Sequence, residues 1–183
     1  MCIRDSRRGI AGEDTAGIIA TLPEIAIQLT YQDGAQHVLL NGEDVSEAIR
    51  TPEISYYASK VSAVPEVRRF LLETQRNMAK NGNILMDGRD IGTVILPDAP
   101  VKIFLTASAQ SRAERRYKEL LMKGEKHDYQ NVLADVRARD YQDTHRAAAP
   151  LRQAEDAVLV DTSELNFDQS FEALKKVIQD RAK

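Results

Sequence analysis

Cysteine, tryptophan and long apolar segments are scarce or missing in this sequence of 183 residues. Its one cysteine, Cys2, excludes an internal disulfide bond and a cysteine-based metal cluster, and it favours a reducing, cytoplasmic setting. No apolar run approaches the length of a membrane-spanning helix, so we expect no membrane partner. With no tryptophan and an aromatic content of 5%, a surface that stacks nucleic-acid bases is also disfavoured.

A large excess of one charge is missing too, because the formal net charge is only −3. A general nucleic-acid binder would present positive charge on one face, so we expect no nucleic-acid partner. Residues 109–146 are rich in charges of both signs, which alone is typical of solvated helices. The apolar content of 43% and the charged content of 29% are those of a globular protein, here one domain with a small inserted lobe.

The remaining pattern predicts an α/β fold with a parallel sheet. Apolar runs without alternation at 84–86, 101–107 and 157–161 are typical of strands buried on both faces. Helices are expected at 52–63, 65–80, 108–124 and 129–142, with one short helix between 87 and 101. A last helix, capped by Asn166 or Asp168, is expected to bury one apolar set: Phe167, Phe171, Leu174, Val177 and Ile178.

Residues 25–46 instead predict an antiparallel hairpin. Apolar and polar residues alternate from Ile25, and Asp33-Gly34 is a strong signal for a tight turn. A second turn at Asn41-Gly42 leads into a third short strand at 44–46. We therefore expect a small lobe separate from the parallel core.

The stretch from Asn83 to Thr93 places Asp-Gly-Arg-Asp directly after an apolar run. At the carboxyl end of a parallel strand, Asp87 is a candidate for a metal ion or its water, and Arg89 is a candidate for a phosphate. Asp90 is a candidate acceptor of hydrogen bonds from a base or sugar, while Gly88 allows a tight turn or a close approach. The alternative is a charged loop in which Arg89 pairs with its neighbours.

Two helices carry further candidates. Arg68 borders the apolar face of the helix at 65–80, although an ordinary surface role is an alternative. Val132, Val136, Arg139 and Asp143 share one helical face, which is expected to point from the core into a cleft. The three histidines, His37, His127 and His145, are scattered and are interpreted as surface residues.

Taken in order, several segments resemble the bacterial cytidylate kinases. They are Asn41-Gly-Glu-Asp-Val-Ser46, Ser59-x-Val61-Ser-Ala63, Val67-Arg68, Asp87-Gly-Arg-Asp-Ile-Gly-Thr93, Pro97 to Leu105, Ser111 to Arg116, Arg139-Asp140-x-x-Asp143, Arg146-Ala-x-Ala-Pro150 and Val160-Asp-Thr-Ser163. The resemblance covers about residues 25–183. It implies a P-loop nucleoside monophosphate kinase core with a small antiparallel β insertion. It also implies transfer of the ATP γ-phosphate to CMP or dCMP, with Mg²⁺, in pyrimidine nucleotide metabolism.

The resemblance also implies roles for individual residues. The substrate-binding residues are Ser59, Arg68, Arg89, Asp90, Arg139, Asp143 and Arg146. The catalytic residues are Asp87, Arg89 and Arg146, and Asp87 also contacts the metal ion indirectly. The lid on the ATP side carries Arg112, Arg115 and Arg116. The implied parts of the chain are an N-terminal remnant (1–24), a monophosphate-binding lobe (25–80) and a kinase core (81–183) with lid helices at about 108–148.

One element of the family pattern is missing. Such kinases carry a glycine-rich loop ending in Gly-Lys, whose amides and lysine hold the ATP phosphates. The first lysine here is Lys60, and no Gly-Lys pair occurs in the sequence. We therefore expect a truncated chain with little or no kinase activity, derived from a parent that is a monomer when full length. A missing central strand would also expose an apolar sheet edge and promote association.

Two other functions are compatible with the sequence. The first is another nucleoside monophosphate kinase, for AMP or UMP, since these share the strand-end Asp-Gly and the lid arginines. The second is a non-catalytic nucleotide-binding domain that has no phosphate loop. Base selectivity in a binding assay separates the first alternative from a cytidylate kinase.

Overall fold

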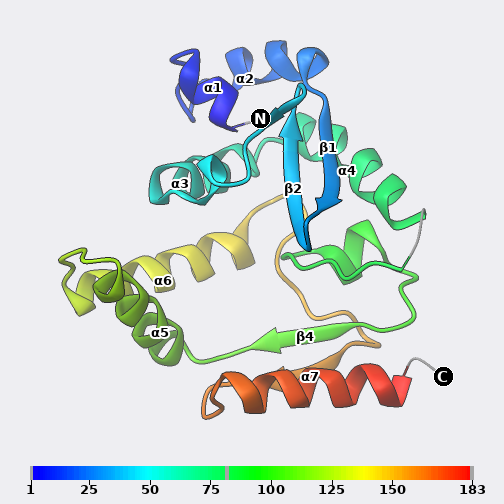
Figure 1. The fold of residues 1–183 in the computed structure, drawn as a ribbon, viewed down its shortest axis with the longest axis vertical. Helices are drawn as coiled ribbons and strands as arrows, with labels where there is room; N and C mark the ends of the chain where they lie inside the picture. The colour runs from blue at the N-terminus through cyan, green and yellow to red at the C-terminus, as the bar shows by residue number, and fades with distance from the viewer. Residues whose placement is uncertain (1, 81–82, 182–183) are drawn as a thin grey trace. The chain divides into compact units, whose positions relative to one another are not determined.

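The structure, a computed structural model, describes residues 2–80 and 83–181, apart from the side chains of Arg4, Pro52, Ser55 and Ser59. The chain divides into two compact units, residues 1–84 and residues 85–183. Figure 1 shows the helices and strands along the chain.

The first unit begins with two short helices, α1 (Cys2–Arg7) and α2 (Thr15–Thr21). The Asp14 side chain accepts a hydrogen bond from the Gly17 amide and so caps α2. The helix passes into a 3-10 turn, η1 (Leu22–Glu24), at Pro23.

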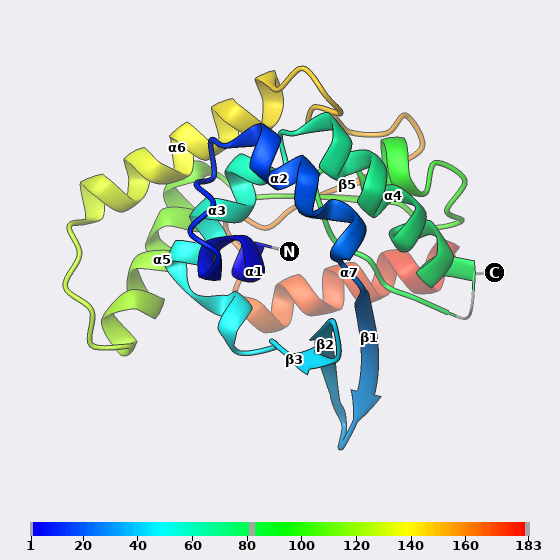
Figure 2. The ribbon, with the colours of Figure 1, turned by 90° about the horizontal axis from the view of Figure 1, so that it is seen from above.

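A three-stranded antiparallel sheet follows, with β1 (Ile27–Gln32), β2 (Ala35–Leu40) and β3 (Glu43–Asp44). Its two long strands pair from Ile27–Leu40 to Gln32–Ala35, and Figure 2 shows the hairpin that they form. Asp33 and Gly34 both have positive φ, 51° and 77°, as a tight hairpin turn requires. The predicted hairpin is confirmed, and its third strand begins one residue earlier and ends two residues earlier than expected.

The helices of this unit enclose its core. A short turn, η2 (Ala48–Arg50), leads into α3 (Pro52–Val61) and α4 (Pro65–Lys80), and both helices begin at a proline as predicted. The side chains of Ile18, Val61 and Val67 are fully buried in a cluster that also includes Leu40 and Val45. Helices and hairpin therefore share one apolar core.

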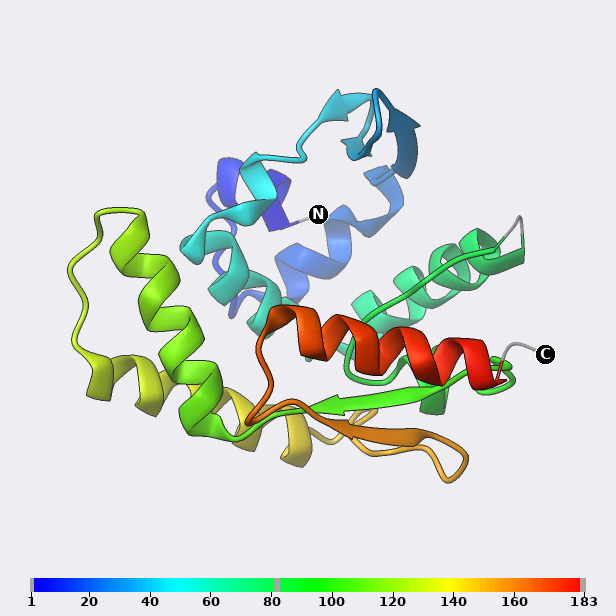
Figure 3. The same ribbon diagram turned by 60° about the horizontal axis from the view of Figure 1, so that its bottom comes forward.

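The second unit contains a parallel pair of strands, β4 (Ile103–Thr106) and β5 (Val158–Asp161), with Ile103 opposite Val158. A single turn of π-helix, η3 (Ile91–Ile95), precedes them, where one short helix is predicted. Helix α7 (Phe167–Arg181) runs alongside the strands, and Figure 3 shows it beside β4 and β5. Asn166 and Gln169 exchange hydrogen bonds as a capping box, so Asn166 is the cap of α7.

Between β4 and β5, helices α5 (Ala109–Met122) and α6 (Tyr129–His145) pack against each other as a helical hairpin. Ser108 and Asp128 cap them through side-chain bonds to the amides of Ser111 and Asn131. The hairpin has its own core of Ala113, Leu120, Val132 and Leu133. Helix α6 extends three residues past its predicted end at Gln142.

Two sequence predictions for this unit are wrong. Residues 84–86 are not a strand, and the Leu85 side chain is 84% exposed. A strand requires a neighbour to pair with, and the sheet described for this unit consists of β4 and β5 alone. The apolar side of α7 is not fully buried either: Phe167 is 84% exposed, and Phe171 and Ile178 are also exposed.

Candidate functional site

The turn that contains Asp87, Gly88, Arg89 and Asp90 enters directly into the π-helix η3. A side chain at position 88 would lie 2.9 Å from two side-chain atoms of Ile91, so any residue larger than glycine would displace that isoleucine. The Asp90 carbonyl accepts hydrogen bonds from the amides of Val94 and Ile95. Single π-helical turns are frequent at functional sites, and this one holds the backbone of Asp90 in place while its side chain is buried.

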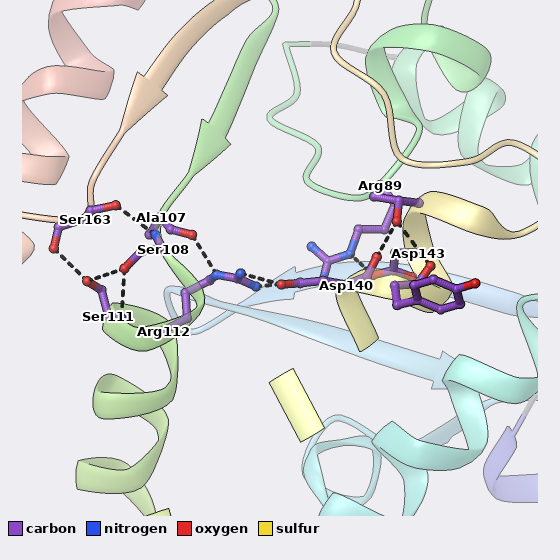
Figure 4. A network of polar contacts seen from close by, with 10 residues as sticks. Arg89, Ala107, Ser108, Ser111, Arg112, Asp140, Asp143 and Ser163 are labelled. Atoms are coloured by element: carbon purple, nitrogen blue, oxygen red, sulfur yellow. Dashed lines mark hydrogen bonds and ion pairs between the residues drawn. The ribbon is translucent and has the colours of Figure 1, made fainter. Parts of the chain in front are cut away.

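The buried Asp90 side chain belongs to a set of paired charges. The Arg146 guanidinium lies 3.5 Å from Asp90 Oδ1 and 3.9 Å from Asp143 Oδ1. Asp143 Oδ2 accepts a hydrogen bond of 2.7 Å from Arg89 Nε, which Figure 4 shows. Only Arg89 is substantially accessible, with 44% of its side chain exposed against 10% for Arg146.

The end of α6 positions two of these side chains. Asp143 lies in the last turn of the helix, and Arg146, three residues later, is its C-terminal cap. The chain then turns back at Ala149, whose φ is 49°; Arg146 Nε donates to the Ala149 carbonyl and the Leu151 amide donates to the Asp143 carbonyl. The turn that follows the helix therefore fixes both charged residues.

One turn earlier on α6, Asp140 binds an arginine from α5. Arg112 donates from both terminal nitrogens to the two carboxylate oxygens of Asp140, at 2.7 and 2.6 Å, and from Nε to the Ala107 carbonyl. The hydrogen bonds from Arg112 hold the pKa of Asp140 below its ordinary value, despite partial burial, and Asp140 in turn raises the pKa of Arg112. This bidentate pair joins the two helices near the start of the hairpin.

The other two predicted lid arginines have different surroundings. Arg115 donates to the carbonyls of Thr162 and Leu165, which ties α5 to the segment after β5. Arg116 pairs with Glu119 of its own helix at 3.5 Å and is partly exposed. Two hydrogen bonds to Ser163 complete this junction, as Figure 4 shows: the Ser108 amide donates to the Ser163 hydroxyl oxygen, and the Ser111 hydroxyl donates to the Ser163 carbonyl.

Other candidates lie apart from this network or outside what the structure describes. The Asp87 and Arg139 side chains are exposed. Arg68 belongs to the first unit, where it donates to the Ser62 carbonyl, and Ser59 lies in α3 with a side chain outside the described part of the chain. Among the residues described, no group of three or more His, Cys, Asp or Glu is arranged to hold a metal ion.

Asp140 was not predicted as a site residue. Its spacing of three residues from Asp143 places both carboxylates on the same side of α6. This spacing could have identified Asp140 as a site residue from the sequence. Arg89 supplies an accessible planar donor group suited to phosphate oxygens, while Asp90 and Asp143 supply acceptors beside it. The arrangement can bind an anion at Arg89 and hydrogen-bond donors of the same ligand at the carboxylates.

Helices long and apolar enough to cross a membrane do not occur in the described residues. A family model described as cytidylate kinase matches residues 4–180, which begins upstream of the segments that carry the resemblance in the sequence.

Curated relatives agree with this match. The chain is 50% identical over 175 residues to a cytidylate kinase of Syntrophotalea carbinolica, covering 96% of this chain and 74% of that protein. It is 50% identical over 166 residues to a cytidylate kinase of Carboxydothermus hydrogenoformans (91% and 75%), and 46% identical over 181 residues to one of Geobacter sp. strain M21 (99% and 78%). With a family model over nearly its whole length and relatives at this identity, the chain belongs to the cytidylate kinase family.

Proposed function

We propose that the protein acts in pyrimidine nucleotide metabolism in the cytoplasm, where its family transfers the γ-phosphate of ATP to CMP or dCMP. The observation that carries this proposal is the Arg89–Asp143–Arg146–Asp90 arrangement, in which one accessible arginine stands beside three buried charges. Family membership supports the same reaction. Phosphoryl transfer depends chiefly on positioning and charge stabilisation, which arginines provide.

In this proposal Arg89 binds the acceptor phosphate, and the two buried aspartates recognise the nucleoside. A carboxylate accepts hydrogen bonds from an amino group or a hydroxyl, so Asp90 suits the exocyclic amine of cytosine and Asp143 the sugar. Arg146 pairs with both carboxylates and holds them in place, and it contributes to the phosphate. Ser59, Arg68 and Arg139 are assigned to the base, the phosphate and the sugar by the family pattern.

On the donor side, Arg112, Arg115 and Arg116 are assigned to the lid that covers ATP. The exposed carboxylate of Asp87 fits Mg²⁺, which commonly binds one or two protein carboxylates and completes its shell with waters and phosphate oxygens. When bound, the metal would neutralise charge on the phosphates. Asp87 would hold that ion directly or through one of its waters.

The sequence contains no Gly-Lys pair, so a phosphate loop of the family's kind is not among its residues. We propose that this chain therefore has little kinase activity, at least roughly a hundredfold below that of its relatives, since one preorganised group of this kind is worth that much. Robust turnover of CMP with ATP by the purified chain would contradict this proposal.

Calorimetric titration of the purified chain with CMP, and with AMP and UMP as competitors, tests the acceptor site. We expect CMP-selective binding that Arg89→Gln weakens by about tenfold, the loss of one charge-assisted hydrogen bond. Lys118→Gln, which removes an exposed charge from α5, is the control and should bind CMP as the unmodified chain does. Equal binding of the three nucleotides, or none by a folded chain, would contradict a cytidine-specific site.

A further inference from the structure

Two arginines from different elements meet neighbouring carboxylates on α6. Arg112 of α5 is bound to Asp140, and Arg89 of the turn before η3 is bound to Asp143, one helical turn further along. Figure 4 shows the two pairs together, with Asp140 and Asp143 on the same stretch of α6. All four residues belong to the second unit.

Asp140 would compete with Asp143 for the Arg89 guanidinium if no other cation were bound to the Asp140 carboxylate. Residues three apart on a helix have Cβ atoms about 5–6 Å apart, which is within the reach of one long arginine side chain. The positive charge of Arg89 already contributes to lowering the pKa of Asp140, after the larger effect of Arg112. Arg112 occupies both oxygens of Asp140 and so leaves Arg89 with Asp143 only.

We propose that Arg112 is a positioning residue for the acceptor phosphate, because it neutralises Asp140 and thereby keeps the Arg89 guanidinium available to that phosphate. The inference rests on the proposed function in that Arg89 is taken as the phosphate ligand. It assigns to Arg112 an effect on the acceptor nucleotide, beyond its assignment to the ATP-side lid. It also gives Asp140 a specific role, as the group through which Arg112 acts.

The proposal and a purely structural role of the Arg112–Asp140 pair predict different effects of substitution on CMP affinity. If the pair only joined α5 to α6, then Arg112→Gln and Asp140→Asn would lower stability together and leave CMP affinity unchanged in the folded protein. If Arg112 shields Arg89, the two substitutions affect CMP differently. Loss of the arginine exposes the carboxylate, whereas loss of the carboxyl charge removes the competitor.

The experiment is a double-mutant cycle of Arg112→Gln and Asp140→Asn, read by calorimetric titration with CMP. We expect Arg112→Gln to weaken CMP binding by roughly tenfold, as for one lost charge-assisted hydrogen bond, and the double variant to return within about twofold of the unmodified chain. Asp140→Asn alone should bind CMP at least as tightly as the unmodified chain. Lys118→Gln and Asp135→Asn, exposed positions on the same two helices, are the matched controls.

A second measurement, without nucleotide, follows the Arg89 Nε–H resonance by NMR. Arg112→Gln should shift it, because the guanidinium is then shared between Asp143 and Asp140, and the double variant should restore it. Unchanged CMP affinity in a folded Arg112→Gln protein, weaker binding by Asp140→Asn, or no recovery in the double variant would each overturn the inference. A folded chain that binds no CMP would contradict the proposed function alone, and the Arg89 resonance would still decide whether Arg112 controls Arg89.

Discussion

At the scale of single residues, the second unit stabilises buried charge by pairing it. Arg146 is the centre of this pairing, since its buried guanidinium faces the carboxylates of Asp90 and Asp143. Desolvation of an ion is costly, so such groups persist in a protein interior only when opposite charges and hydrogen bonds surround them. Arg146 therefore stabilises the folded unit and also positions the two carboxylates of the candidate site.

Replacement of Arg146 by methionine is expected to lower the free energy of unfolding of the second unit by about 3 kcal/mol, because Asp90 is left buried without that guanidinium. Urea denaturation followed by far-UV circular dichroism measures the change. Arg137→Met, at an exposed position on the same helix, should change it by less than about 0.5 kcal/mol. Equal stability of the two variants would show that the buried pair contributes nothing.

A second residue-scale prediction concerns the hairpin. The Ser46 hydroxyl and amide and His37 Nδ1 lie within hydrogen-bonding distance of the Asp44 carboxylate, and together they lower its pKa to about 2. Because this pKa is depressed from 3.8, the carboxylate stabilises the hairpin fully above that pH, and its contribution is lost as the pH falls through about 2.

A carboxyl NMR titration should give a midpoint near pH 2 for Asp44. Ser46→Ala should raise this midpoint more than His37→Gln does, because the serine hydroxyl is the larger cause of the depressed pKa. A larger rise in the His37→Gln variant would contradict this assignment of causes.

At the level of secondary-structure elements, the α5–α6 hairpin has an apolar core of its own within the second unit. Leu120 and Leu133 are buried between the two helices, and Tyr117 and Tyr129 pack edge to face with ring centroids 5.9 Å apart. The Arg112–Asp140 pair adds a polar tie at the other end of the hairpin. A hairpin with its own apolar core can keep its shape while its attachments to β4 and β5 change.

Leu133→Ala is expected to destabilise this hairpin by roughly 2–4 kcal/mol, because it removes buried methyl groups and leaves a cavity. Hydrogen exchange measured by mass spectrometry should then show faster exchange across α5 and α6. Leu121→Ala is the matched control, since Leu121 is exposed and its truncation leaves no cavity. Comparable exchange in the two variants would mean that the helices are not held by this core.

At the scale of the whole molecule, apolar side chains are left at the surface of the second unit. Leu85, Leu105, Leu159, Phe167 and Phe171 are all exposed, although a strand and helix of this composition usually bury such residues. Exposed apolar area and open strand edges favour association between protein chains. We therefore expect this chain to associate in solution more readily than a protein whose apolar side chains are buried.

We predict that the chain self-associates, so that its average mass in sedimentation velocity rises above 20.5 kDa as the concentration increases. Phe167→Ser combined with Phe171→Ser should reduce this association, because the two side chains are one turn apart on α7. Tyr31→Ser removes an exposed aromatic ring from β1 of the first unit and should leave association unchanged. A constant mass at all concentrations would contradict the prediction.

The sequence by itself determined the features that depend on neighbouring residues. Prolines at 52 and 65 begin α3 and α4, and Asp33-Gly34 turns the hairpin, as predicted; Ser108 and Asp128 cap α5 and α6. Each of these signals acts within about four residues of itself, so it can be read without knowing the fold. The ordered motifs likewise identified the family before any contact was known.

Only the tertiary structure decided which apolar segments are buried and which charged residues meet. Residues 84–86 have the composition of a buried strand, but strand formation depends on a pairing edge that the local sequence does not specify. Arg89 and Asp143 are 54 positions apart, and Arg112 and Asp140 are 28 apart, so no local pattern predicts that they bind. Their pairing arises where α6 passes both α5 and the turn before η3, which is a property of the folded unit.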